Sequence, residues 1–245
     1  MVNQVVVNAG TRYVTGMQVS RAAANKLSVS AGAVREQTNV NDIIATAAFD
    51  VYTNRQGLNG LDIGTIAAST SYTLFAVSNS YDKSVFGAVL STGVDAPNAL
   101  PEGCDMYWPI AHNIKTDGSS NLLNFVRIGN GHIRTHLFDA PIALDLSGGN
   151  DTSFTEVDCS DIVPANCKAL LLVSMTPNSA GNAVRFRYTG FAAANGQTGV
   201  SGDVAAVATI ENSYIIVDAD STFEYKVSSA SDAAVASVIG FEDVL

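Results

Sequence analysis

Three short runs of alternating apolar and polar residues lie between Trp108 and Phe138, and two turn clusters separate them. The runs are W-P-I-A-H-N-I-K, N-L-L-N-F-V-R-I and H-I-R-T-H-L-F, and the turn clusters are T-D-G-S-S and G-N-G. Asp-Gly and Asn-Gly supply the positive-φ positions of tight turns, and alternation with period two is typical of a strand with one buried face. The pattern predicts a β-meander, and it restricts the chain to a β-rich fold.

Other segments carry similar signals. Residues 71–79 place apolar side chains on both faces and predict a central strand, and residues 84–92 predict another strand. The apolar run at residues 168–176 predicts a strand covered on both faces, whereas residues 184–188 alternate cleanly. Residues 40–53 fit either a short helix or an irregular strand, and the sequence leaves both open.

These signals predict an all-β protein with an N-terminal extended arm over residues 1–39, followed by two antiparallel β-sandwich (jelly-roll-like) domains. The first sandwich is expected over residues 40–140 and the second over residues 141–245, because a new series of strand-like runs begins after Pro141. These runs recur about every 8–12 residues, a spacing typical of sandwiches. A Gly- or Pro-rich linker between the two halves is missing, so we expect the domains to abut.

The first 35 residues differ from the rest of the chain in charge and in apolar content. They hold four basic residues and no acid, while the strand-like bursts contain few large apolar side chains. We therefore expect an arm without a core of its own, which attaches to an acidic surface on another copy of the chain or on a larger assembly. The attachment candidates are Arg12, Arg21, Lys26 and Arg35.

The composition excludes some partners. The 245-residue chain has a formal net charge of −10 and only 15% charged residues, which argues against nucleic-acid binding, since phosphate contacts need clustered Lys and Arg. No apolar run approaches the length of a membrane span, and the N-terminus lacks the pattern of a signal peptide. The three cysteines cannot all pair, so synthesis in a reducing cytoplasm is expected.

Candidate chemical sites are weak. His132 and His136 lie four residues apart, which in an extended strand is about 13 Å, too far for one zinc ion. Asp218 and Asp220 lack the spacing of a calcium loop and fit Asx-turns better. Loop carboxylates could supply a glycosidase pair, but nothing singles out two of them, and nucleophile motifs are missing. We expect no enzyme activity, no metal and no cofactor.

Aromatic residues in loop-prone positions could stack on sugar rings. The glycan-contact candidates are Trp108, Tyr107 and Tyr81. For Trp108 and Tyr107 the competing interpretation is that they open a strand and fill the end of a core.

Several of these segments resemble proteins of a known kind. G-T-I-A-A-S-T-S-Y-T-L-F-A-V-S-N, followed by L-S-T-G-V-D-A-P-N-A-L-P-E-G-C-D-M-Y-W-P-I and T-D-G-S-S-N-L-L-N-F, resembles a module of tailed-bacteriophage fibre and other virion proteins. Y-I-I-V-D-A-D-S-T-F-E-Y-K-V and V-I-G-F-E-D are similar to a terminal sandwich found with that module, and L-S-V-S-A-G-A-V-R-E-Q-T-N-V-N-D-I resembles its lead-in. The resemblance covers residues 27–139 and 214–243, and Cys104 stands where the module has an aromatic residue.

The resemblance implies a virion component, commonly a homotrimer, that joins other tail or capsid proteins through its N-terminal arm. The expected function is that of a short tail fibre or tail-associated adhesin that contacts host surface glycans. A capsid decoration, cement or head-fibre protein is the alternative within this class, and a particle-borne polysaccharide-degrading enzyme is the alternative outside it. Either way, the expected location is the virion, after synthesis in the bacterial cytoplasm.

Overall fold

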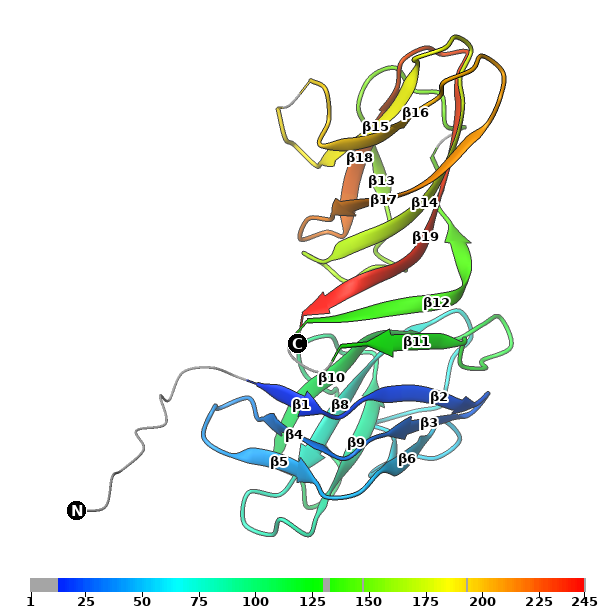
Figure 1. The fold of residues 1–245 in the computed structure, drawn as a ribbon. Helices are drawn as coiled ribbons and strands as arrows, with labels where there is room; N and C mark the ends of the chain where they lie inside the picture. The colour runs from blue at the N-terminus through cyan, green and yellow to red at the C-terminus, as the bar shows by residue number, and fades with distance from the viewer. Residues whose placement is uncertain (1–12, 130–132, 147, 193, 245) are drawn as a thin grey trace, which may run out of the picture. The chain divides into compact units, whose positions relative to one another are not determined.

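The computed structural model describes residues 13–129, 133–146, 148–192 and 194–244, and these residues form strands, turns and loops without any helix. The strands assemble into five sheets, nearly all of them antiparallel (Figure 1). One short parallel pair, β7 (Gly60–Leu61) with β9 (Phe86–Ser91), is the exception among the strand pairs of this part of the chain. The prediction of an all-β protein is confirmed.

The described residues fall into two compact units, and the chain passes from the first to the second at about residue 124, ahead of the expected boundary at residue 141. The strands of the first unit are β1 (Val14–Gly16), β2 (Val19–Ala23), β3 (Lys26–Val29), β4 (Gly32–Arg35), β5 (Asp42–Ala45), β6 (Phe49–Tyr52), β7, β8 (Ser71–Ser78), β9 and β10 (Met106–Lys115). Those of the second are β11 (Phe125–Ile128), β12 (Ile133–Ala143), β13 (Thr155–Asp158), β14 (Lys168–Thr176), β15 (Ala183–Tyr188), β16 (Thr198–Ser201), β17 (Thr209–Ile216), β18 (Thr222–Val227) and β19 (Ala233–Val244).

The first unit contains two three-stranded sheets, β1-β4-β5 and β2-β3-β6, and one four-stranded sheet, β10-β8-β9-β7. Strand β8 lies between β10 and β9, and its side chains from Tyr72 to Ser78 are buried on both faces. The prediction of a central strand at this position is confirmed, because an uninterrupted apolar run needs cover on both sides.

The N-terminal segment is more deeply integrated than its composition predicts. Residues 1–12 lie outside the described part of the chain, but β1 to β4 pair with each other and with β5 and β6. Leu27, Val29 and Val34 have no exposed surface. Over residues 13–35, the segment expected to lack a core of its own packs against later strands of the same chain, since its small and β-branched side chains lie opposite Ile43 and Val51. Attachment of residues 1–39 to another protein stays a prediction.

Two short strands, β5 and β6, lie within residues 40–53, the segment whose sequence fits either a short helix or an irregular strand. Val51 is fully buried in β6, and it faces Leu27 across the β3–β6 pair. Pairing with the N-terminal strands therefore decides this segment in favour of strand, in line with the β-branched and aromatic residues it carries.

The predicted three-stranded meander is wrong in one pairing. Strand β10 pairs with β8, whereas β11 pairs with β12. Between β10 and β11, the residues on either side of the Asp-Gly turn form only one isolated bridge, between Thr116 and Leu122. Alternation and turn residues show that strands and hairpins form, but they do not select the partner when a more apolar strand such as β8 competes.

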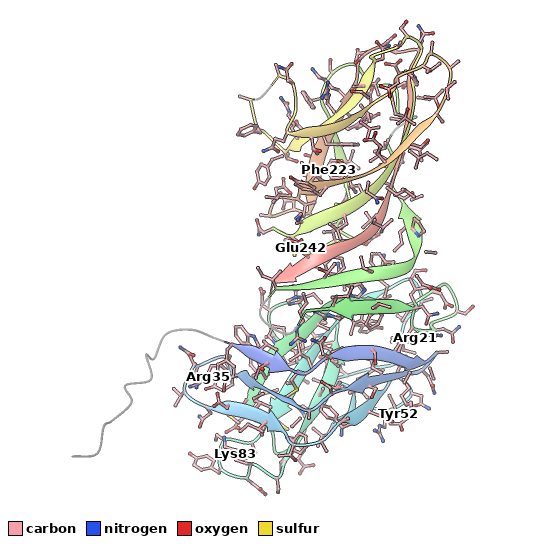
Figure 2. The ribbon with its side chains drawn as sticks, viewed as in Figure 1. Arg21, Arg35, Tyr52, Lys83, Phe223 and Glu242 are labelled. Atoms are coloured by element: carbon pink, nitrogen blue, oxygen red, sulfur yellow. The ribbon has the colours of Figure 1, made fainter. Side chains whose placement is uncertain are left out.

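In the second unit a five-stranded sheet, β11-β12-β19-β14-β17, and a four-stranded sheet, β13-β18-β15-β16, enclose one shared core. Its aromatic members include Phe186, Phe223 and Tyr225, which have no exposed surface. Phe223 is labelled in Figure 2. The rings of Phe186 and Phe223 meet edge to face at 5.8 Å. The same core contains Leu171 of β14 and Phe241 of β19, so large side chains from both sheets fill one interior.

Strand β14 is central in its sheet, between β19 and β17. Its buried residues are Ala169, Leu171, Val173 and Met175, and the residues between them are half-exposed. The expectation of cover on both faces is therefore wrong. Leu170 lies opposite Tyr214 on the outer face, where an exposed aromatic neighbour gives it partial cover.

Candidate functional site

The most exposed large aromatic side chain among the described residues is Tyr81, at 94% exposure. It lies in the loop of residues 79–85, which connects the buried strand β8 to β9. A tyrosine ring on a soluble protein normally covers part of its own surface by packing, so a ring presented this openly is available to a ligand. We call residues 79–85 the Tyr81 loop.

Side chains at the base of the Tyr81 loop hold its backbone in place. The Oδ1 atom of Asn79 accepts hydrogen bonds from the backbone N–H groups of Tyr81 and Asp82, at 2.8 and 2.7 Å. The carboxylate of Asp82 accepts from the N–H and hydroxyl of Ser84, at 3.0 and 2.6 Å. These are Asx-type turns, in which a short polar side chain substitutes for a backbone partner.

The loop is also tied to the segment that precedes β10. The carboxylate of Asp105 accepts hydrogen bonds from the backbone N–H of Ser80 at 2.7 Å and from its hydroxyl at 2.5 Å. The amide of Asn79 donates to the carbonyl of Gly103 at 2.5 Å. Tyr81 is therefore carried by a loop whose conformation is fixed before any ligand arrives, which reduces the entropy lost on binding.

Hydrogen bonds favour the charged form of two carboxylates, Asp82 within the Tyr81 loop and Asp105 beside it. The Ser84 hydroxyl and backbone N–H lower the pKa of Asp82. The Ser80 hydroxyl lowers the pKa of Asp105, against a smaller opposing effect of burial, and the charge of Lys83 acts in the same direction as Ser80. Because each anion is held by hydrogen bonds, the loop keeps its shape over the neutral range.

An open pocket of about 400 Å³ is lined in part by Lys83 of the Tyr81 loop. The Lys83 side chain is labelled in Figure 2. Most of the lining surface of the pocket is apolar, although five of its six lining residues carry a polar group: Asn41, Asp42, Ile44, Thr46, Ser78 and Lys83. Amide, hydroxyl, carboxylate and ammonium groups around one apolar side chain can donate to and accept from sugar hydroxyls. The volume lies within the range typical of small-ligand sites, about 300–1,000 Å³.

The three aromatic glycan-contact candidates do not form one exposed surface. Tyr107 packs against the core, with its ring edge to face at 6.1 Å from Phe75. Trp108 is half-buried on β10. Of the three, Tyr81 is the ring that the structure exposes. Lys83 of the same loop was not among the sequence candidates, and Asp105, which holds Ser80, was considered there only as one of several loop carboxylates. The run N-S-Y-D-K-S, rich in turn formers, is the signal that points to the loop.

The basic attachment candidates have partners within the first unit. Lys26 forms an ion pair with Asp50 at 3.0 Å, and the hydrogen bond to that carboxylate raises the Lys26 pKa. Arg35 forms an ion pair with Asp42 at 2.7 Å. Arg21 is near enough to Asp117 to lower the pKa of that carboxyl, although hydrogen bonds from Asn121 contribute more, and Arg12 lies outside the described residues. Acids from later strands thus balance much of this positive charge.

The sequence positions considered for metal or acid chemistry have structural roles. Asp218 accepts hydrogen bonds from the N–H groups of Asp220 and Thr222, which confirms the turn interpretation. His136 is stacked between Phe125 and Phe241, with ring centroids 4.6 and 4.7 Å away, while His132 lies outside the described residues. Within the described part of the chain, no three His, Cys, Asp or Glu side chains gather closely enough to hold a metal ion.

The three cysteines are free thiols. Burial raises the pKa of Cys159 to about 12, and the charges of Asp158 and Asp218 add to the effect. Cys159 and Cys167 are buried, as predicted for cysteines that pack as small apolar groups. Burial also raises the pKa of Cys104. A thiol that stays protonated at neutral pH is a poor nucleophile.

Comparison with known proteins adds no further constraint: no family model, no curated protein and no solved structure matches this chain. Among the described residues, no helix is long and apolar enough to cross a membrane. The functional argument therefore depends on the geometry of the Tyr81 loop and its pocket.

Proposed function

We propose that this chain is a non-enzymatic structural protein of a bacteriophage virion, a short tail fibre or tail-associated adhesin that contacts host surface glycans. The observation that supports the proposal most directly is the Tyr81 loop, which is held by hydrogen bonds at its base, exposes an aromatic ring and contributes Lys83 to an open pocket. Aromatic faces cover the apolar C–H face of a sugar ring, while amides and carboxylates bind its hydroxyls.

The architecture fits a display role. Two sheets around one core in the second unit support the proposed β-sandwich with jelly-roll-like connections, and a sandwich offers loops at its ends that can vary without disturbing the core. Charged residues make up only 15% of the chain, so polar uncharged groups cover much of the surface. In this proposal the N-terminal residues 1–39 join the chain to other virion proteins, and the mature oligomer is a homotrimer.

The glycan contact is tested by a binding comparison. The full-length protein is incubated with surface polysaccharide purified from candidate host bacteria, and retention is compared for the wild type, Tyr81→Ala and Phe191→Ala. Phe191 is a matched control because it is an aromatic residue in a loop of the second unit and is 48% exposed. Loss of binding in the Tyr81 variant alone supports the proposal. Equal binding by all three proteins contradicts a role for Tyr81.

The position in the virion needs a separate measurement. Labelled copies of the chain are located on imaged particles and counted. A tail location with a few tens of copies supports the fibre or adhesin, whereas hundreds of copies on the head would replace it by the capsid decoration protein. Shortening of the polysaccharide during incubation would instead indicate a degrading enzyme.

A further inference from the structure

A second pocket in the first unit contains an arginine that forms no ion pair within the described part of the chain. The pocket has a volume of about 520 Å³ and lies along the loop that follows β6. Arg55 contributes to its lining together with Asn54, Gln56 and Thr65, and Leu61 and Ile66 add apolar surface. It shares no lining residue with the pocket beside the Tyr81 loop.

Two contacts hold the Arg55 guanidinium in place. Its central carbon lies 4.2 Å from the centroid of the Tyr52 ring, a cation–π contact, and its Nε donates a hydrogen bond to the carbonyl of Asn59 at 3.0 Å. Tyr52 is labelled in Figure 2. These contacts engage the ring-facing surface and the Nε–H group of the guanidinium. The two terminal nitrogens make none of the hydrogen bonds found among the described residues, and a pair of such nitrogens matches the two oxygens of a carboxylate.

The backbone around Arg55 is equally constrained. The carbonyl of Arg55 accepts from the N–H of Leu61 at 2.8 Å, and the Gln56 side chain donates to the carbonyl of Gly64 at 2.7 Å. Asn59 anchors the loop to β9, since its Oδ1 accepts from the N–H of Ala88 at 3.0 Å. The guanidinium is thus fixed before binding, which lowers the entropy that a ligand must offset.

Arg55 is the one charged residue that lines this pocket among the described residues. Asp62, next to the lining residue Leu61, accepts hydrogen bonds from the N–H groups of Ile63 and Asn98. Asp50, an acid next to Tyr52 in the β6 region, is already engaged: it pairs with Lys26 at 3.0 Å and accepts from the Tyr52 hydroxyl at 3.4 Å. The remaining polar groups of the pocket, the amides of Asn54 and Gln56 and the hydroxyl of Thr65, are uncharged and match hydroxyl groups. A ligand with one carboxylate among several hydroxyls satisfies both features.

We propose that the Arg55 pocket binds a carboxylate-bearing sugar residue, such as a uronic acid within an acidic polysaccharide. Arg55 binds the carboxylate through its terminal nitrogens, and the neighbouring amides and hydroxyl bind the sugar hydroxyls. The choice of a saccharide over an acidic peptide rests on the proposed adhesin function, whereas the carboxylate specificity rests on Arg55 alone.

The test uses the full-length protein and a galacturonic-acid oligosaccharide, with its methyl ester as a neutral ligand of the same shape. Calorimetry is expected to show that the protein binds the acid form and that its affinity for the ester is lower by about tenfold or more. Added salt should lower the affinity for the acid form. Arg55→Gln is expected to abolish the preference for the acid form, and Arg55→Lys to restore it only in part because an ammonium cannot bind in bidentate fashion.

The control variant is Arg185→Gln, which removes an exposed arginine of β15 in the second unit. It should bind the acid oligosaccharide as the wild type does, and circular dichroism should show the same folded state for all variants. The proposal would be overturned if the wild type bound acid and ester equally or bound neither. It would also be overturned if Arg55→Gln and Arg185→Gln lost the same affinity for the acid oligosaccharide. Equally tight Arg55-dependent binding of a Glu-containing peptide would overturn the saccharide assignment.

This test is separate from that of the adhesin. A Tyr81→Ala variant should bind the uronic-acid oligosaccharide normally, because Tyr81 does not line this pocket. If the Arg55 experiment fails while polysaccharide binding still depends on Tyr81, only the proposal for the Arg55 pocket is rejected. If the Tyr81 experiment fails while binding of the acid oligosaccharide still depends on Arg55, only the proposal for the Tyr81 loop is rejected.

Discussion

At the scale of single residues, the buried carboxylate of Glu36 shows how this protein handles polar groups. Glu36 follows β4 and has no exposed surface, yet its carboxylate accepts hydrogen bonds from the Thr38 hydroxyl at 2.6 Å and from the N–H groups of Val40 and Asn41, both at 2.9 Å. Burial raises the pKa, but the hydrogen bonds outweigh burial and bring it down to about 2. One anion thus organises the whole β4–β5 turn.

This predicts a specific pH dependence. Because the folded pKa of about 2 lies below the ordinary value of 4.5, the contribution of Glu36 to stability is fully present above pH 4.5 and is lost as the pH falls from there towards 2. We expect Glu36→Gln to lower the free energy of unfolding by about 1–3 kcal/mol at pH 7, and by much less at pH 2. Urea unfolding at several pH values measures this.

A matched control is Glu102→Gln, since Glu102 is an exposed loop carboxylate of the same unit. It should leave the stability unchanged at each pH. If Glu36→Gln and the wild type lost stability in parallel on acidification, the assignment of the effect to Glu36 would be wrong.

At the scale of elements, the Tyr81 loop depends on residues that do not touch the proposed ligand. Asn79 holds the N–H groups of Tyr81 and Asp82, and Asp105 holds Ser80. We expect Asn79→Ala to weaken polysaccharide binding through a less ordered loop, while changing global stability by only about 1 kcal/mol. Faster amide hydrogen exchange confined to residues 79–85, together with weaker binding, would confirm this. Weaker binding with unchanged exchange would show that Asn79 acts on the ligand directly.

The elements also show what sequence patterns can predict. The strand at residues 71–79 was predictable because both of its faces are apolar, and the turns at Asp218 and Asp82 because short polar side chains accept from nearby N–H groups. The partner of β10 was not predictable, because alternation identifies a strand but carries no information on which distant strand lies beside it. For the same reason, composition did not show that β3 is buried against β6.

The candidate site was predictable only in part. Tyr81 was identified as an aromatic residue in a turn-rich loop, but the same argument applied to Tyr107, which instead packs against Phe75. Lys83 and Ser78 reach their pocket together with Asn41 and Thr46 because β5 and β8 belong to the same unit, and no local pattern connects these segments. Arg55 was not singled out, since its contact with Tyr52 follows from the bend of one loop.

At the scale of the whole molecule, the outer face of the five-stranded sheet carries exposed apolar side chains on β17 and β19, the strands on either side of β14. They are Ile210, Tyr214 and Ile216 on β17 and Val235 on β19, each more than half exposed. Beside them, Lys168 forms an ion pair with Glu242 at 2.9 Å (Figure 2). Contiguous exposed apolar groups are typical of surfaces that associate.

The proposed homotrimer gives this face a testable role. If it contributes to the trimer, Ile210→Ser combined with Ile216→Ser should shift the molar mass measured by light scattering from three chains towards one at micromolar concentration. Val94→Ser, which removes an apolar residue of the first unit that is 62% exposed, should leave the mass unchanged. A wild-type mass of one chain would contradict the homotrimer, and an unchanged mass in the double variant would place its contact elsewhere.

The core of the second unit sets its stability. Phe223 lies on β18 with no exposed surface and contacts Phe186 from the neighbouring strand. Phe223→Ala should lower the free energy of unfolding by about 3–5 kcal/mol, because it removes a large ring and leaves a cavity. Phe191→Ala, at an exposed loop position, should cost less than about 1 kcal/mol. Chemical denaturation that showed similar losses for both would mean that this core can collapse around the missing ring.

The position of β19 has a consequence for how the protein is made. This strand contains residues 233–244, yet it lies inside the five-stranded sheet, between β12 and β14. A nascent chain that ends before residue 233 therefore leaves β12 and β14 without the strand that joins them. On the ribosome, the larger sheet can therefore close only after these residues have emerged, and a polypeptide terminated before them lacks the whole pairing of β19 with β14.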